Sequence, residues 1–135
     1  METLTAPFVR RATVSFGRGH SGSVDNPTWP EVELILHESS ERGGRVDLQS
    51  DDETEMTVFA ENGTFHVTVS VGETDYYFAS DGSEPTEETQ DIFGHSFNRH
   101  QVIKNLASVA DVAKTWWATG ERSESMLWLH ETLDV

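Results

Sequence analysis

Histidines and carboxylates are the side chains of this 135-residue chain that could support acid–base or metal chemistry, and it contains six and 24 of them. His95 and His100 are five residues apart, whereas a zinc-binding pair on one helix face needs a spacing of four. His95 and Ser96 are sequence neighbours, and neighbours on a strand point to opposite faces, so they form no nucleophile–base pair. Because the histidines share no motif, we predict no catalytic residue, no metal site and no cofactor.

Three glycines, Gly17, Gly19 and Gly22, have the spacing of a dinucleotide-binding loop. In that motif the glycines open a helix inside a βαβ unit, with an acidic residue about 20 positions further on. No such unit can be assembled here. We interpret residues 16–27 as a loop.

Two acidic groups and a tyrosine pair between them are the candidate binding residues. The chain has nine Lys and Arg against 24 Asp and Glu, a formal net charge of -15. Such a charge repels nucleic-acid phosphates and anionic lipid and attracts basic proteins, although it also fits a surface that serves only solubility. Aromatic side chains inside a charged rim are typical of binding hot spots. The predicted partner-binding residues are Asp51, Asp52, Glu53, Glu55, Tyr76, Tyr77, Glu84, Glu87, Glu88 and Asp91.

Hydrophobic periodicity predicts the elements that must position these residues. A helix begins after a capping box of Thr28 and Glu31 and ends at Gly43. A second helix begins at Ser108, with Asp111 as its capping partner, and ends at Gly120. Strands are predicted over 11–16, 45–49, 55–60, 64–71, 74–79 and 126–130, the last as an interior strand because both of its faces are apolar. Residues 80–91 are predicted to be a loop, and residues 93–103 have no clear pattern apart from a short strand at 102–103.

Asn62-Gly63 predicts a tight hairpin turn, whose register can be tested on the sequence. A two-residue turn would place six apolar residues on one face of the hairpin and polar or aromatic residues on the other. The six form the pairs Ala60 with Phe65, Val58 with Val67 and Met56 with Val69. The other face pairs Phe59 with His66 and Thr57 with Thr68.

The elements add up to a single α+β domain over residues 1–135, with a mostly antiparallel sheet of five or six strands and two helices packed on it. No window of about 18 apolar residues is present, and the N-terminus lacks a signal-peptide pattern. The chain has no cysteine, which excludes disulfides and thiolate metal sites. We expect a cytoplasmic protein.

The chain resembles the type-one immunity proteins of bacterial polymorphic toxin systems over about residues 27–130. An early helix begins at Trp29-Pro30-Glu31, and a hairpin stretch reads ENGTFHVTV. A later helix ends in aromatics and a glycine, and a polar loop then leads to a strand that holds a tryptophan. The residues that carry this last likeness are Ala113, Trp116, Trp117, Gly120 and Trp128.

The resemblance implies a non-enzymatic α+β protein that binds and neutralises a cognate toxin. Toxins linked to the family include nucleic-acid deaminases and other effectors, such as nucleases. Because such toxins hold phosphates in basic grooves, an acidic partner could block the active groove without any catalytic group. We therefore expect a basic toxin domain as the partner, no direct binding of nucleic acid or membrane, and a monomer or a homodimer.

Two alternatives remain open at the level of sequence. The first is a small enzyme or ligand-binding domain whose pocket is rimmed by His66, Tyr77, His95 and His100. The second is an acidic mimic of DNA, which requires carboxylates lined up at the spacing of duplex phosphates.

Overall fold

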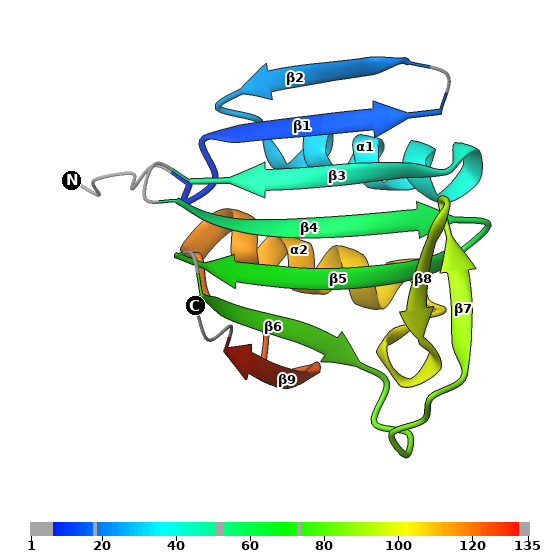
Figure 1. Ribbon diagram of the computed structural model, residues 1–135. Helices are drawn as coiled ribbons and strands as arrows, with labels where there is room; N and C mark the ends of the chain where they lie inside the picture. Colours follow the sequence, from blue (N-terminus) through cyan, green and yellow to red (C-terminus); the bar gives the residue numbers. More distant parts are fainter. Residues whose placement is uncertain (1–6, 18, 51–52, 73, 133–135) are drawn as a thin grey trace.

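The computed structural model describes residues 7–17, 19–50, 53–72 and 74–132 (Figure 1). Seven strands form one antiparallel sheet in the order β2-β1-β3-β4-β5-β6-β9, and two further strands form a separate hairpin. The helices are α1 (Trp29–Arg42), α2 (Leu106–Thr119) and the short 3-10 helix η1 (Arg99–Gln101). The strands are β1 (Arg11–Phe16), β2 (Ser21–Asp25), β3 (Gly44–Gln49), β4 (Thr54–Glu61), β5 (Thr64–Val71), β6 (Asp75–Ser80), β7 (Thr89–Ile92), β8 (His95–Asn98) and β9 (Leu127–Thr132).

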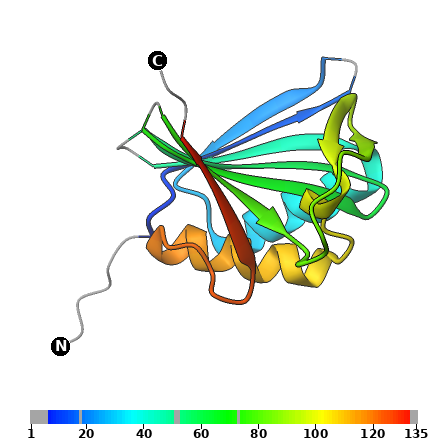
Figure 2. The same cartoon turned by 60° about the horizontal axis from the view of Figure 1, so that its bottom comes forward.

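This architecture confirms the predicted α+β class, with seven strands in the main sheet instead of five or six. Helices α1 and α2 cover one face of the sheet, and the β7–β8 hairpin runs across the opposite face (Figures 1 and 2). We call this opposite face the outer face. The core lies between the sheet and the helices, where Val32, Leu36 and Trp116 are almost completely buried. The Trp116 indole also donates a hydrogen bond to the Leu48 carbonyl of β3, at 3.2 Å, which joins α2 to the sheet.

Helix α1 begins as the sequence predicts. The Thr28 amide donates to Glu31 Oε1 at 2.9 Å, and the Glu31 amide donates to Thr28 Oγ1 at 3.4 Å, so the capping box is complete. The Thr28 amide and the Thr28 hydroxyl, which also donates to Glu31 Oε1 at 3.0 Å, hold the pKa of Glu31 below its ordinary value, because both hydrogen bonds favour the charged carboxylate. The helix ends at Gly43, which has a φ of +81°.

The register of the β4–β5 hairpin is also confirmed. Asn62 and Gly63 occupy the turn with positive φ values, and the six predicted apolar residues pair in the predicted order. All six side chains are fully buried against the helices. The outer face consequently receives the other set of this hairpin, Thr57, Phe59, His66 and Thr68.

Two segments predicted as loops contain strands. Residues 21–25 form β2, which pairs with β1 at the edge of the sheet, and residues 89–92 form β7 within the predicted acidic loop. Neither segment has a regular apolar alternation, because β2 packs little against the core and β7 belongs to a small hairpin. Within residues 93–103, where no pattern was clear, the chain forms β8, η1 and an isolated bridge between Ile103 and Phe65.

Two predictions about the C-terminal elements were wrong. Helix α2 begins at Leu106, about half a turn before Ser108, because the Asn105 side chain caps it by accepting a hydrogen bond from the Ser108 amide at 3.1 Å. Strand β9 lies at the edge of the sheet and not in its interior. Its two apolar faces have different surroundings, because Trp128 packs against the core whereas Leu127 remains 55% exposed.

Among the described residues, no helix is long and apolar enough to cross a membrane.

Gly120 is predicted to be critical for the end of α2. It has a φ of +73°, and a Cβ at this position would lie 2.5 Å from the Phe8 ring, which itself packs edge-on against Trp116. We expect Gly120→Ala to lower the free energy of unfolding by about 2–4 kcal/mol, from left-handed strain plus overpacking. Urea denaturation would measure the loss. Gly82→Ala is the control, because Gly82 has a φ of +84° with open space around it, and should lose only about 1 kcal/mol. Equal losses would contradict the role of the Phe8 contact.

Candidate protein-binding surface

Neither α1 nor α2 covers the outer face of the sheet, and the β7–β8 hairpin crosses it near one end (Figures 1 and 2). The strand register aligns one outer-face residue from each strand into a row across the sheet, close to the uncovered end. We call it the transverse row, and its members are Asp25, Arg11, Gln49, Glu55, Ser70, Tyr76 and Glu131.

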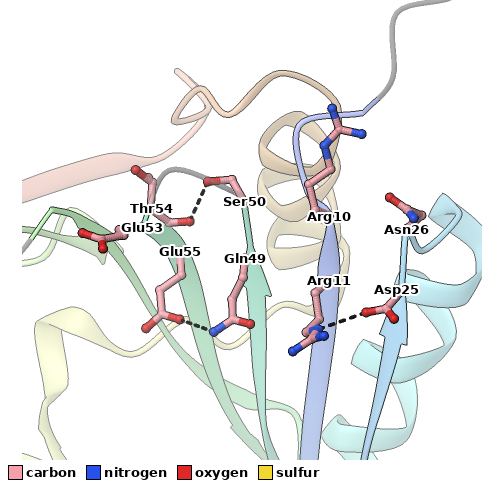
Figure 3. A pocket seen from close by; sticks show the side chains of 9 residues that line it. All are labelled: Arg10, Arg11, Asp25, Asn26, Gln49, Ser50, Glu53, Thr54 and Glu55. Carbon is pink, nitrogen blue, oxygen red and sulfur yellow. Dashed lines mark hydrogen bonds and ion pairs between the residues drawn. The ribbon is translucent and has the colours of Figure 1, made fainter.

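One half of the transverse row borders an open hollow of about 810 Å³, where strands β1 to β4 meet their connecting segments (Figure 3). Arg11 pairs with Asp25 across β1 and β2 at 3.0 Å, and the Gln49 amide donates to Glu55 at 3.1 Å. Both side-chain pairs link neighbouring strands, so they fix the floor of the hollow. The hollow is lined by Arg10, Arg11, Asp25, Asn26, Gln49, Ser50, Glu53, Thr54 and Glu55.

The next row of the outer face is mostly uncharged. Thr57 donates a hydrogen bond to the Asp47 carboxylate at 2.7 Å, and Arg45 also binds this carboxylate, at 3.1 Å. Thr68 and Phe78 continue the row toward β9. Because Asp47 is engaged by a hydroxyl and a guanidinium, the middle of the outer face presents hydroxyl and aromatic groups with little free charge.

The far end of the outer face is closed by an aromatic cluster beneath the β7–β8 hairpin. Phe97 of β8 stacks on His66 of β5 with ring centroids 3.9 Å apart and 13° between the planes, and it also contacts Phe59.

The Gln101 carbonyl accepts a hydrogen bond from His66 Nδ1 at 3.1 Å, and a carbonyl cannot donate. His66 is therefore the Nδ1–H tautomer, and Nε2 accepts from the Thr68 hydroxyl at 2.9 Å. His66 is only 2% exposed and serves as a buried structural residue.

The structure divides the predicted binding residues between two ends of the outer face. Glu53, Glu55 and Tyr76 lie at the end where β4 begins and β5 ends. Glu84, Glu87 and Glu88 lie in the exposed connection after β6, at the opposite end, with Asp91 on the exposed side of β7. Glu88 already pairs with Arg99 at 3.1 Å. Asp51 and Asp52 lie outside the described residues.

Tyr77 does not share a surface with Tyr76, because successive residues of β6 point to opposite faces of the sheet. The Tyr77 ring stacks on His130 with centroids 4.5 Å apart, and the Arg122 guanidinium lies 3.6 Å from its centroid. His130 in turn binds Asp75 at 2.9 Å, and this hydrogen bond is the main reason why the pKa of Asp75 is lowered.

Tyr77, Arg122 and His130 border an open groove of about 1060 Å³ between the segment after α2 and strand β9. Sequence reasoning missed Arg122 and His130 as partners of Tyr77. No local pattern relates these residues, since they are brought together only by the pairing of β6 with β9.

The four residues of the predicted pocket do not converge. His66 and His95 belong to the aromatic cluster of the outer face, whereas Tyr77 lies on the other face of the sheet. His100 is buried in η1, where its ring accepts a hydrogen bond from the Thr86 amide. Among the described residues, no group of three or more His, Cys, Asp or Glu could hold a metal ion.

No protein-family model and no curated protein matches this sequence. The fold is similar to a solved structure, that of a hypothetical protein from Neisseria gonorrhoeae, with a TM-score of 0.62 and 13% sequence identity. The match covers 94% of this chain and 99% of the other. At this identity the comparison shows that the two chains share a fold.

Burial of His66 predicts an acid-sensitive stability. Desolvation lowers its pKa from 6.5 to about 4. Above pH 6.5 the ring is neutral in both the folded and the unfolded state, whereas between pH 6.5 and pH 4 mainly the unfolded state binds a proton. We therefore expect His66 to cost the folded protein about 3 kcal/mol as the pH falls through this window, from about 1.4 kcal/mol per pKa unit.

The measurement is urea denaturation between pH 4 and pH 8. His66→Gln keeps a donor for the Gln101 carbonyl and should show a smaller loss of stability than the wild type over this range. His37→Gln, in which an exposed histidine is replaced, should keep the wild-type slope. Identical slopes in all three proteins would contradict the assignment.

Proposed function

We propose that this chain is an immunity protein that binds and neutralises a cognate toxin in the cytoplasm and catalyses no reaction itself. The proposal is supported chiefly by the outer face, whose middle is neutral and whose two ends carry carboxylates. Residues of both predicted acidic groups border this one face, although they are far apart in the sequence. The resemblance to immunity proteins in the sequence adds to this support.

The outer face has the size of a protein-binding surface. Seven strands at about 4.8 Å spacing span about 29 Å, and the eight-residue strands β4 and β5 are about 27 Å long. The product of these lengths is about 780 Å², and the shorter flanking strands and the β7–β8 hairpin leave less than this open, compared with about 800 Å² per partner in a standard interface. A single partner domain could therefore cover the face without a rearrangement of the sheet.

The charge of the chain favours a basic partner. A toxin that acts on nucleic acid must hold phosphates and so presents a basic groove. A net charge of -15 would steer such a groove toward this protein, and partly buried aromatic side chains would slow its release. The carboxylates fall into two groups with Thr57, Thr68 and Phe78 between them, which differs from the continuous line of charge that a DNA mimic needs.

A co-expression assay tests the function directly. We expect a toxin-like C-terminal domain to be encoded immediately upstream, in a gene for a large secreted protein. Expression of that domain should stop growth, and co-expression of this chain should restore it. Purified together, the two should form a one-to-one complex. Toxicity that persists despite stable expression of this chain would contradict the proposal.

Charge reversal tests the surface. Glu84→Lys combined with Glu87→Lys should slow association with the toxin about tenfold at low salt and flatten the salt dependence, because steering by the outer face is lost. Glu33→Lys combined with Glu124→Lys is the control, because both residues are exposed, lie away from the outer face and change the net charge equally. Association rates measured by stopped flow should stay closer to wild type in the control. The same slowing in both variants would show that net charge alone steers association.

A further inference from the structure

The two tyrosines of this chain are neighbours in sequence but have opposite surroundings. The Tyr77 ring already binds a cation, because Arg122 lies 3.6 Å from its centroid, and the stacked His130 occupies its other face. No ring contact or side-chain hydrogen bond engages Tyr76 within the described part of the chain, although its side chain is half-buried on the outer face. Tyr76 thus offers a ring face that the protein itself does not use.

A carboxylate lies beside this unused ring. Glu131 of β9 is the direct cross-strand neighbour of Tyr76, and side chains in this relation have Cβ atoms about 4.5–5.5 Å apart. Glu131 is exposed and, within the described residues, makes no ion pair. On the other side of Tyr76, Ser70 and then Glu55 continue the transverse row. The ring therefore lies between two carboxylates, and the nearest guanidinium of the row, that of Arg11, is paired with Asp25.

We infer that Tyr76 and Glu131 form a receptor for an arginine side chain of the partner protein. This inference rests on the proposed function and names the chemistry by which its surface recognises the toxin. A guanidinium stacks on an aromatic face and simultaneously donates parallel hydrogen bonds to a carboxylate. The protein makes the stacking half of this arrangement internally, between Arg122 and Tyr77. At Tyr76 the ring and the carboxylate are both present and the cation must come from outside.

Arginine fits this pair better than lysine. Its guanidinium is planar and weakly hydrated, so it lies flat on a ring at little desolvation cost, whereas an ammonium is a compact and strongly hydrated point charge. Arginine is also the cationic residue that is enriched at protein interfaces and that grips phosphates in nucleic-acid-binding grooves. A toxin arginine bound here would no longer be available to the nucleic acid.

Fluorine NMR can observe this site separately, because the chain contains only two tyrosines. Protein labelled with 3-fluorotyrosine should give two resonances, assigned with Tyr76→Phe and Tyr77→Phe. We expect a capped peptide with three arginines, at low ionic strength, to shift the Tyr76 resonance and leave that of Tyr77 nearly unchanged. A peptide with three lysines should bind at Tyr76 at least about threefold more weakly.

Matched variants separate the receptor from general acidity. Glu131→Gln should weaken the arginine-dependent shift of Tyr76 about threefold to tenfold, whereas Glu33→Gln on α1, with the same change in net charge, should have little effect. Equal shifts of both tyrosines, equal binding of the two peptides, or equal effects of the two variants would each overturn the inference. Tighter binding of free arginine than of the peptide would overturn the assignment to a protein side chain.

The toxin complex distinguishes failure of the receptor from failure of the proposed function. If Tyr76→Ala and Glu131→Gln both leave toxin affinity unchanged while the wild-type chain still neutralises the toxin, the receptor is wrong and the proposed function stands. If the arginine peptide binds as described but no neutralisation occurs, the proposed function is wrong and the arginine site stands.

Discussion

The pairing of β4 with β5 determines which side chains of this protein face its core and which lie on the outer face. A slip of β5 by one residue against β4 would move Val67 to the outer face and bring His66 against the helices. Burial of six apolar side chains prevents this slip, since each contributes on the order of 1–3 kcal/mol. Paired residues on neighbouring strands point to the same face, so the other strands of the sheet place their side chains in step with this hairpin. The transverse row and the aromatic cluster therefore both depend on the register of one hairpin.

The outer face is asymmetric because only one of its ends is covered. The β7–β8 hairpin lays Phe97 on His66 and Phe59, and so removes an aromatic patch that would otherwise be exposed. The opposite end keeps an open hollow, and there, among the described residues, Glu131 has no ion pair and Tyr76 has no ring contact. Aromatic packing therefore stabilises one end of this surface, and the other end stays open. The aromatic packing lowers stability in acid, because the buried His66 binds a proton more readily in the unfolded state than in the folded state.

Electrostatics and packing have complementary parts in the proposed binding. The net charge acts over a range of about 8–10 Å at moderate salt and raises the rate of encounter with any basic protein. It does not choose among basic proteins. Selection requires short-range groups whose geometry is set by the sheet, and the pair formed by Tyr76 and Glu131 is such a group because adjacent strands hold its two members in a fixed register.

Local sequence determined the elements whose signals lie within a few residues. The capping box of Thr28 and Glu31, the Asn62-Gly63 turn and the six apolar pairs of the hairpin involve short-range geometry, and the structure has them as expected. The edge position of β9, the docking of Phe97 on His66 and the stacking of Arg122 on Tyr77 were decided only by the tertiary structure. These contacts join residues that are distant in the chain, and nothing in their immediate sequence specifies the partner. Sequence alternation required one tyrosine of the pair to face outward, but only the order of the strands shows that it is Tyr76 and that Glu131 lies beside it.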